Sequence, residues 1–226
     1  MATLTVYPDG DPETNSVDGM VAEGTDNQTW ATKHDAATGD EADPTAAELA
    51  CQISAGTNVN TWLRIRRIFL LFLTSALGAG ADITAGVLSV VAVSKSDQLG
   101  GSGAVRLVTS TPAPTTNLVT ADYDQLGTTA QTDTDPTIAG ITADSATFTD
   151  FTLNATGIAS ISKTGVTKFG LRITKDATNT EPTYEGTNNA SRVTWEMAEE
   201  IVAGDKRPKL VITYTVPSAA MMIVND

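Results

Sequence analysis

One long apolar segment constrains this chain more than any other feature. From Trp62 to Thr74, an alternation of arginine and apolar residues passes into the unbroken apolar run Ile68–Leu73. A run that is apolar on both faces is typical of a strand covered from both sides. The sequence therefore predicts an extended segment at the centre of a layered β structure.

Short extended segments recur along the rest of the chain, separated by clusters of Gly, Pro, Asn and Asp. Alternating or apolar runs predict further strands at Leu4–Val6, Leu88–Val93, Arg106–Val108, Phe148–Leu153, Phe169–Ile173, Val193–Ala198 and Leu210–Thr215. We expect Leu88–Val93 to pair with the long apolar strand as a hairpin across Gly78–Asp82. Eight or more strands at this spacing favour an all-β fold, an antiparallel jelly-roll β-sandwich.

One or two short helical turns complete the expected fold. The pair Asp43–Pro44 suits a helix start and predicts a helix over Thr45–Ala50, but the alternation over residues 49–53 predicts a strand equally well. Ile158 and Ile161 lie three residues apart and fit a single helical turn.

The expected organisation is one domain over residues 1–226. It has an acidic strand and loop segment at 1–60, the sandwich core at 61–216 and an apolar tail at 217–226. The segment Ile68–Val93 is not expected to cross a membrane, because Asp82 and three glycines interrupt it. No signal peptide is expected at the start of the chain, since it has neither a basic region nor a long apolar stretch there.

The charge is acidic and unevenly distributed. Asp and Glu number 27 against 14 Lys and Arg, a net charge of −13, and the first 50 residues hold eleven acidic residues and one Lys. Such a chain repels phosphate backbones and anionic lipid surfaces. We expect neither nucleic acid nor a membrane as a partner.

Few residues are suited to catalysis. The single histidine, His34, lies in a polar stretch and is expected at the surface, while the single cysteine, Cys51, is expected in the core. The Glu-x-Asp-x-x-Glu run of common sandwich glycosidases does not occur, although carboxylates near Tyr184 and after Trp195 leave an acidic pair open. The sequence therefore predicts a protein that is not an enzyme.

Calcium is the metal that the acidic loops would suit best, because hard cations prefer carboxylate and carbonyl oxygens. Aspartate capping of turns explains the same residues without a metal. The candidate pairs are Asp9 with Asp11, Asp122 with Asp124, and Asp133 with Asp135. No other cofactor is expected.

Glycan binding would use exposed aromatic rings stacked on sugar rings. Trp30, Tyr123 and Tyr184 lie in expected loops and are the candidates, whereas Trp62 and Trp195 lie on expected strands and are assigned to the core. Aromatic residues make up only 5 % of the chain, which argues against a broad stacking platform.

The tail ends with four consecutive apolar residues, Met221, Met222, Ile223 and Val224. The tail either folds back over its own sheet or adds to a neighbouring subunit as a strand or apolar arm. The second alternative makes these four residues a candidate assembly interface.

The order of motifs resembles that of the DNRLRE-type jelly-roll domains, which are carbohydrate-binding-module-like sandwiches. The similarity begins with Arg67–Phe72, continues through Thr74–Leu77 and Gly80–Ile83, and ends with Arg207–Tyr214 as the closing strand. It covers roughly residues 60 to 216. The chain departs from the family pattern at Leu73, where these domains usually carry Asp.

A second resemblance is to jelly-roll structural proteins of bacteriophage and environmental viral genomes. It is carried by five short motifs, Val17–Gly19, Thr29–Thr32, Ser110–Pro112, Asp122–Tyr123 and Ile161–Gly165. It implies a structural subunit of a viral particle, such as a capsid decoration, head or tail protein, or of another extracellular assembly. Such a subunit would act by self-association, with itself and other virion or surface proteins as partners. The alternative is a glycan-binding module of a tail fibre or adhesin.

Overall fold

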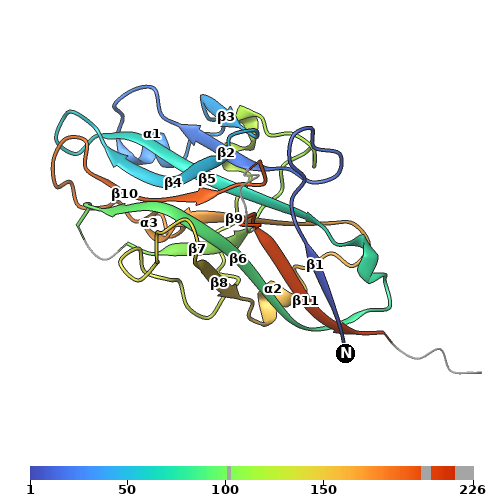
Figure 1. Ribbon diagram of the computed structural model, residues 1–226. Helices are drawn as coiled ribbons and strands as arrows, with labels where there is room; N and C mark the ends of the chain where they lie inside the picture. The colour runs from blue at the N-terminus through green and yellow to red at the C-terminus, as the bar shows by residue number, and fades with distance from the viewer. Residues whose placement is uncertain (101–102, 200–204, 217–226) are drawn as a thin grey trace, which may run out of the picture.

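The computed structural model describes residues 1–100, 103–199 and 205–216, and antiparallel strand pairing dominates it (Figure 1). Every pairing between its named strands is antiparallel. The strands are β1 (Ala2–Val6), β2 (Asp18–Glu23), β3 (Glu41–Asp43), β4 (Glu48–Ala55), β5 (Trp62–Leu73), β6 (Asp82–Asp97), β7 (Val105–Thr109), β8 (Phe148–Thr152), β9 (Val166–Ile173), β10 (Ala190–Glu196) and β11 (Lys209–Thr215). The short helices are α1 (Trp30–His34), η1 (Ser75–Leu77), η2 (Thr120–Asp124), α2 (Ala155–Ala159) and α3 (Thr174–Ala177).

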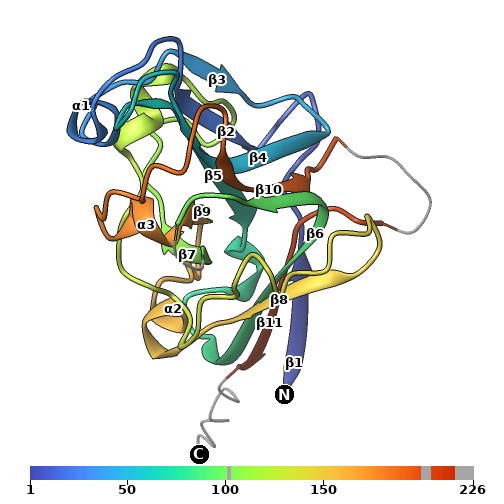
Figure 2. The same ribbon diagram turned by 90° about the vertical axis from the view of Figure 1, so that its left-hand side faces the viewer.

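Two long strands organise the sheet. The edge of β5 opposite β2 is shared, because residues 62–66 pair with β4 and residues 68–73 pair with β9. In β6, residues 82–89 pair with β11, residues 87–91 with β8 and residues 92–97 with β10. The sheet therefore divides at β5 and again at β6, and folds back on itself (Figure 2). The predicted all-β antiparallel sandwich with short helical turns is confirmed.

The hairpin expected between β5 and β6 is wrong. Both edges of β5 are occupied by β2, β4 and β9, and β6 pairs with β8, β10 and β11 instead. The chain leaves β5 at Thr74, whose buried hydroxyl lies 2.6 Å from the Ser162 carbonyl oxygen and 2.7 Å from the Thr167 hydroxyl. The turn η1 and Gly78, with φ of +74°, then carry the chain into a different group of strands.

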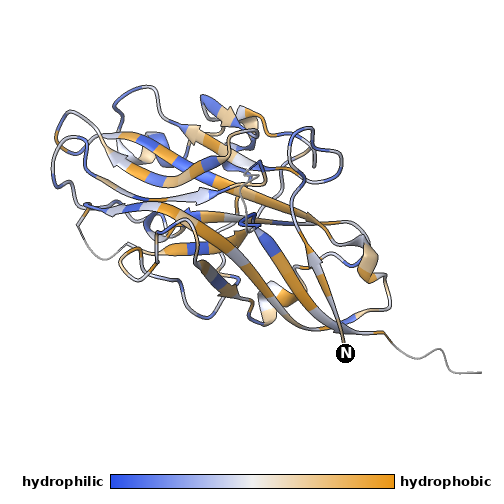
Figure 3. Cartoon of the chain, in the orientation of Figure 1, coloured by the Kyte–Doolittle hydropathy of each residue, from blue (hydrophilic) through white to orange (hydrophobic). Residues whose placement is uncertain are grey.

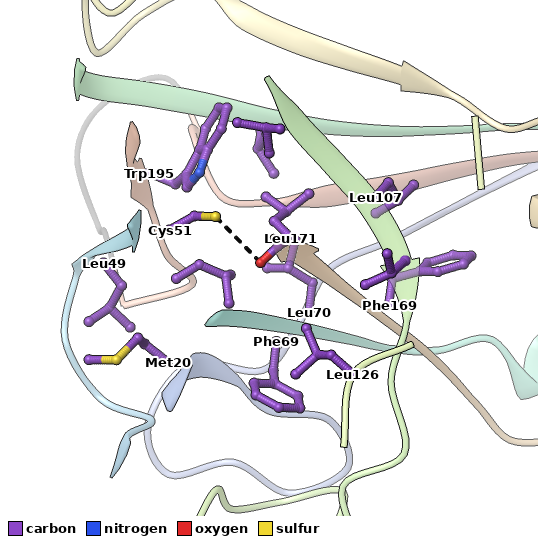
Figure 4. Close-up of a cluster of buried hydrophobic side chains, with 14 of the residues drawn as sticks. Met20, Leu49, Cys51, Phe69, Leu70, Leu107, Leu126, Phe169, Leu171 and Trp195 are labelled. Carbon is purple, nitrogen blue, oxygen red and sulfur yellow. Dashed lines mark hydrogen bonds between the residues drawn. The ribbon is translucent and has the colours of Figure 1, made fainter. Parts of the chain in front are cut away.

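The apolar run in β5 lies in the core as predicted. Residues 68–72 are completely buried, and apolar side chains from β2, β4, β7, β9 and β10 gather with them (Figure 4). Apolar colour follows the long strands β5, β6 and β11, whereas the connecting loops are mainly polar (Figure 3). Cys51 is fully buried, as expected, and burial raises the pKa of its thiol.

The two helix expectations are now resolved. Residues 48–55 form the strand β4, and Asp43 instead caps a turn before it by accepting hydrogen bonds from the amides of Thr45 and Ala46, both at 3.1 Å. The turn around Ile158 is present as α2, where the Asn154 side chain accepts a hydrogen bond from the Gly157 amide at 2.9 Å.

The acidic first quarter of the chain contributes the strands β1 to β4 to the sheet, with loops between them. Its strand β2 pairs with both β3 and β5, and β4 lies between β5 and β10. Within the described ranges, no helix is long and apolar enough to cross a membrane.

Truncating the apolar run tests how much the core depends on β5. Leu70→Ala removes a fully buried side chain from the strand between β2 and β9. We expect the free energy of unfolding in urea to fall by about 2–5 kcal/mol, because the change leaves a cavity. Leu63→Ala, at a half-buried position of the same strand, should cost clearly less. Equal losses in the two variants would contradict the central place given to this run.

Candidate functional site

A buried ionic centre joins β5 to β9 and α3, two consecutive elements that lie far from β5 in the sequence. The Asp176 carboxylate of α3 accepts hydrogen bonds from Arg67 of β5 at 2.8 and 3.0 Å and from Arg172 of β9 at 2.6 and 2.9 Å. All three residues are at most 3 % exposed. Each arginine therefore makes a two-pronged contact, the strongest geometry available to a guanidinium and a carboxylate.

The strand register explains why two arginines meet here. Ile68 pairs with Leu171 at the start of the β5–β9 ladder, so Arg67 and Arg172 are next in register across the two strands. Like charges at such positions repel each other. The carboxylate of Asp176 lies between them and offsets that repulsion.

The remaining guanidinium donors are satisfied by backbone oxygens. Arg67 donates to the carbonyls of Tyr123 at 2.8 Å and His34 at 3.1 Å, and its guanidinium lies 4.0 Å from the centre of the Tyr123 ring. Arg172 donates to the carbonyls of residues 126, 127 and 176 at 3.3, 3.1 and 3.0 Å. The centre thereby attaches α1, η2 and α3 to β5 and β9; Figure 2 shows α1 and α3 on the side of the molecule away from β1 and β11.

His34 is part of this centre, so its predicted place at the surface is wrong. Its side chain is only 12 % exposed. The Nε2 atom lies 2.9 Å from the Asp176 carbonyl oxygen, and Nδ1 lies 2.5 Å from the Asp35 carboxylate. The helix α1 directs the imidazole ring towards the ionic centre, and each ring nitrogen already has a hydrogen-bonding partner within the protein.

The charges of the centre suit a structural role better than acid–base chemistry. Burial by itself would raise the pKa of Asp176, but the two guanidinium groups hold it well below its usual range. Burial would likewise lower the pKa of Arg67, yet Asp176 raises it. The carboxylate stays ionised at neutral pH, and the arginine donors are directed at protein oxygens rather than at a ligand.

The aromatic candidates for glycan stacking are mostly buried. Trp30 is the first residue of α1 and is only 6 % exposed, with its ring stacked on His34 and its Nε1 donating to Asn179 at 2.9 Å. Tyr123 is fully buried in η2 and donates from its hydroxyl to the Lys33 carbonyl at 2.8 Å. The expectation that both lie in exposed loops is therefore wrong.

Tyr184 is half-buried and belongs to the same aromatic cluster. Its ring meets Trp62 edge-to-face at 6.5 Å, and Trp62 meets Trp30 in the same manner at 5.7 Å. The indole Nε1 of Trp62 donates a hydrogen bond to the Glu181 carboxylate at 2.8 Å. Glu181 is one of the carboxylates near Tyr184 that the sequence left open as half of an acidic pair, and here it has a structural partner. The structure thus brings Trp30 and Tyr184 together through Trp62, but as packing and not as an open platform.

The aspartates proposed for calcium have other uses in the fold. Asp9 accepts hydrogen bonds from the amides of residues 14 and 15 at 3.1 and 2.7 Å, and buried Asp122 accepts one from the Val119 amide at 2.9 Å. Asp135 forms an ion pair with Arg106 at 2.8 Å. Asp11, Asp124 and Asp133, the other members of the three predicted pairs, take no part in these hydrogen bonds or in this ion pair. Across residues 1–100, 103–199 and 205–216, no group of three or more acidic, histidine or cysteine side chains is arranged to hold a metal ion.

A polar pocket lies between β8 and the loop before it. Its cavity volume is about 280 Å³, and it is lined by Thr132, Asp133, Thr134, Pro136, Asp150 and Thr152. Asp133 and Asp150 are exposed, and the Asp150 carboxylate accepts a hydrogen bond from the Ser89 hydroxyl at 2.6 Å. The lining offers hydroxyl and carboxylate groups but no aromatic ring.

The sheet also has an open edge at β1. This strand pairs with β11 over its whole length, and no other strand in the described part of the chain pairs with it. Thr3 and Thr5 are exposed on it. The proposed assembly residues Met221, Met222, Ile223 and Val224 lie outside the described residues.

Sequence reasoning missed the ionic centre, although a signal was present. Arg67 immediately precedes the apolar run, and Arg172 interrupts the apolar segment of β9. A charged residue inside a buried strand needs a buried partner. The sequence did not indicate Asp176 as that partner, because it belongs to a polar stretch that follows β9.

Comparison with known proteins yields no match, either among protein-family models or among curated proteins. The resemblance to DNRLRE-type and viral jelly-roll proteins remains a prediction.

Removing the central carboxylate should destabilise the fold strongly. Asp176→Asn leaves two buried guanidinium groups without a counter-charge, and we expect a loss of about 3–5 kcal/mol in the free energy of unfolding at pH 7. Because folding lowers the pKa of Asp176, its stabilisation is present above the ordinary value of 3.8 and is lost as pH falls below it. The difference between wild type and variant, measured by urea unfolding, should therefore shrink between pH 5 and pH 3.

Asp82→Asn, a change at an exposed position of β6, provides the control and should leave stability nearly unchanged. A similarly small effect of Asp176→Asn would show that the ionic centre does not hold these elements together.

Proposed function

We propose that this protein is a non-enzymatic structural subunit of a virion or of another extracellular assembly and that it acts by self-association. The observation that carries the proposal is the open edge of β1. An unpaired strand edge presents a row of amide and carbonyl groups to any neighbouring chain, and natural proteins usually protect such edges. An edge left unprotected favours strand addition between subunits.

The other edge strands, β3, β7 and β8, each carry a protection that β1 lacks. The strand β8 pairs only with β6 and has the exposed, charged Asp150 at its centre. The strand β3 is only three residues long and carries Glu41 and Asp43. The outer edge of β7 is covered, because the carbonyls of Leu107 and Thr109 accept hydrogen bonds from the amides of Gln131 and Gly127, at 2.9 and 2.8 Å. Short length, charge and covering loops are all common protections.

None of these protections is present in β1. Its sequence, ATLTV, contains no charged residue and no proline, and its register with β11 runs without a bulge from Ala2 to Val6. Leu4 and Val6 are partly buried against the core, which holds the strand in place. A second copy could therefore continue the sheet by pairing its own β1 with this edge, a self-complementary contact of the kind found in two-fold dimers.

Two lysines on the edge should block this contact. In Thr3→Lys/Thr5→Lys, antiparallel pairing of two β1 strands would bring like charges together across the new interface. We expect wild type to form assemblies of molar mass well above the 23.5 kDa of one chain, and the variant to remain monomeric with unchanged circular dichroism. Light scattering after size-exclusion chromatography measures the mass, and negative-stain microscopy shows the particles.

The matched control is Thr128→Lys/Thr129→Lys, which adds the same charge at two exposed loop positions away from β1. It should assemble like wild type. A monomeric wild type at all concentrations, or an edge variant that assembles normally, contradicts the proposal. Deletion of residues 219–226 tests separately whether the apolar tail adds a second contact.

The polar pocket supports a second candidate function, a glycan-binding module. Carboxylates and hydroxyls on a concave surface suit the many hydroxyl groups of a sugar, since each carboxylate can accept two hydrogen bonds. The buried rings of Trp30 and Tyr123 do not support stacking, so the pocket is the better location for this function.

Changing two exposed pocket residues tests this alternative. On a glycan array, Asp133→Asn/Thr134→Val should reduce any glycan signal of wild type at least several-fold, because two direct hydrogen-bonding groups are altered. The Thr128→Lys/Thr129→Lys variant is the control and should bind normally. Retained binding by the pocket variant, or no binding by wild type, counts against a glycan site at this position.

A further inference from the structure

A second buried charged cluster lies where the segment between β1 and β2 meets the turn after β10. Asp18, the first residue of β2, is 0 % exposed, and one of its carboxylate oxygens accepts a hydrogen bond from the Ala198 amide at 2.8 Å. Its other oxygen, Oδ1, is buried and has no hydrogen-bond partner in the described part of the chain. A buried oxygen without a hydrogen-bond partner, called orphaned below, costs free energy of folding, and the cost is larger when its carboxylate is ionised.

Other orphaned oxygens belong to the same two segments. The hydroxyl of Ser16, Oε1 of Glu13 and both carboxylate oxygens of Glu199 are buried and lack hydrogen-bond partners among the described residues. The two segments approach closely, because a Cβ atom at Gly10 would lie 3.2 Å from the Ala198 carbonyl oxygen. We call Glu13, Asp18 and Glu199 the acidic latch.

The charges acting on the latch have the same sign. Glu199 and Glu13 act on Asp18, while Glu13 and Asp11 act on Glu199. No Lys or Arg of the described ranges forms an ion pair with any of these four residues. Glu196, at the end of β10, is also buried, but it has an interaction of its own and is not a member of the latch.

Asp18 is fully buried, and half-buried Glu13 and Glu199 direct buried oxygens towards the same region. Ionising such neighbouring carboxylates together is costly without a counter-charge. Carboxylates in such clusters retain protons to higher pH, and a protonated carboxyl can donate a hydrogen bond to an ionised neighbour. The arrangement is the opposite of the ionic centre, where two guanidinium groups hold a carboxylate in its charged form.

We propose that the acidic latch is a proton-dependent contact that holds the segment between β1 and β2 against the turn after β10 in acid and weakens as the latch ionises. Protonation of Asp18 and Glu199 removes their repulsion of each other and of Glu13 and supplies donors for the orphaned oxygens. Ionisation restores the repulsion and favours separation of the two segments. This inference does not depend on the proposed self-association.

The direction of the pH effect follows from proton linkage. Burial raises the pKa of Glu199 from 4.5 to about 7, and the negative charges of Glu13 and Asp11 add to this shift. The nearby backbone amides of Glu199 and Asp11 act in the opposite direction, but their geometry is too poor for a hydrogen bond to the carboxylate. Burial and the charge of Glu199 also raise the pKa of Asp18. The folded state therefore binds more protons than the unfolded state above pH 4.5, and stability falls as pH rises towards about 7.

Urea unfolding of wild type and Glu199→Gln at pH 5 and pH 8 tests the latch. We expect Glu199 to raise the unfolding equilibrium constant of wild type about tenfold over this range, the effect of a one-unit pKa difference, since water screens part of the larger shift at a half-buried group. Glu199→Gln cannot ionise at this position and should lose this tenfold part, while the part due to Asp18, whose pKa burial also raises, stays. Asp176 does not titrate in this window, so the ionic centre does not contribute.

The control is Asp82→Asn, which should keep the pH dependence of wild type. A carboxyl-carbon NMR titration of Glu199 in wild type gives a second measurement that needs no variant, and its midpoint should lie above pH 6. A midpoint near the ordinary value of 4.5, or equal pH dependence in wild type and Glu199→Gln, overturns the proposal. Recovery of the lost stability at pH 8 by added Ca²⁺ also overturns it, because the latch would then be a cation site.

Discussion

The pairing of Asp176 with Arg67 and Arg172 is the interaction on which the arrangement of the loops depends. Strand pairing places the two arginines next in register, and each would be a destabilising buried charge on its own. The carboxylate of α3 satisfies both, and their remaining donors reach the backbone of α1, η2 and the segment that follows it. One carboxylate therefore determines where three separate segments attach to the sheet.

The aromatic cluster is a consequence of the same attachment. Once α1 is held by the contact of Arg67 with the His34 carbonyl, Trp30 stacks on His34 and meets Trp62. The rings are thereby removed from solvent, which is why residues that suit sugar stacking in an isolated sequence serve as packing here. The exposed polar groups near Asp133 and Asp150 lie elsewhere, beside β8.

The two buried charged clusters differ in how their charges are balanced. The ionic centre has a hydrogen-bond partner for almost every polar atom and keeps its groups ionised. The acidic latch has several orphaned oxygens and no cationic partner among the described residues, so protons are the counter-charge available to it. The same fold thus contains one contact that is constant near neutral pH and one that we infer to change with pH.

The sequence alone determined the extended character of the chain, the apolar centre at residues 68–72 and the burial of Cys51, because these follow from local alternation and from the cost of exposing apolar surface. It also located the turn of α2 through Ile158. The sequence did not predict which strands pair. The strands β5 and β6 are adjacent in the sequence, yet each pairs with other strands and not with the other.

Only the tertiary structure decided which polar residues come together. The register of β5 with β9 brings Arg67 to Arg172 and Asp176, which are themselves only four residues apart. The meeting of β2 with the turn after β10 brings Asp18 to the Ala198 amide, next to Glu199. The periodicity of a segment records which side chains are buried, but not which distant strand lies opposite. Contacts between residues far apart in sequence depend on the pairing of the whole sheet, and this pairing decided both the ionic centre and the acidic latch.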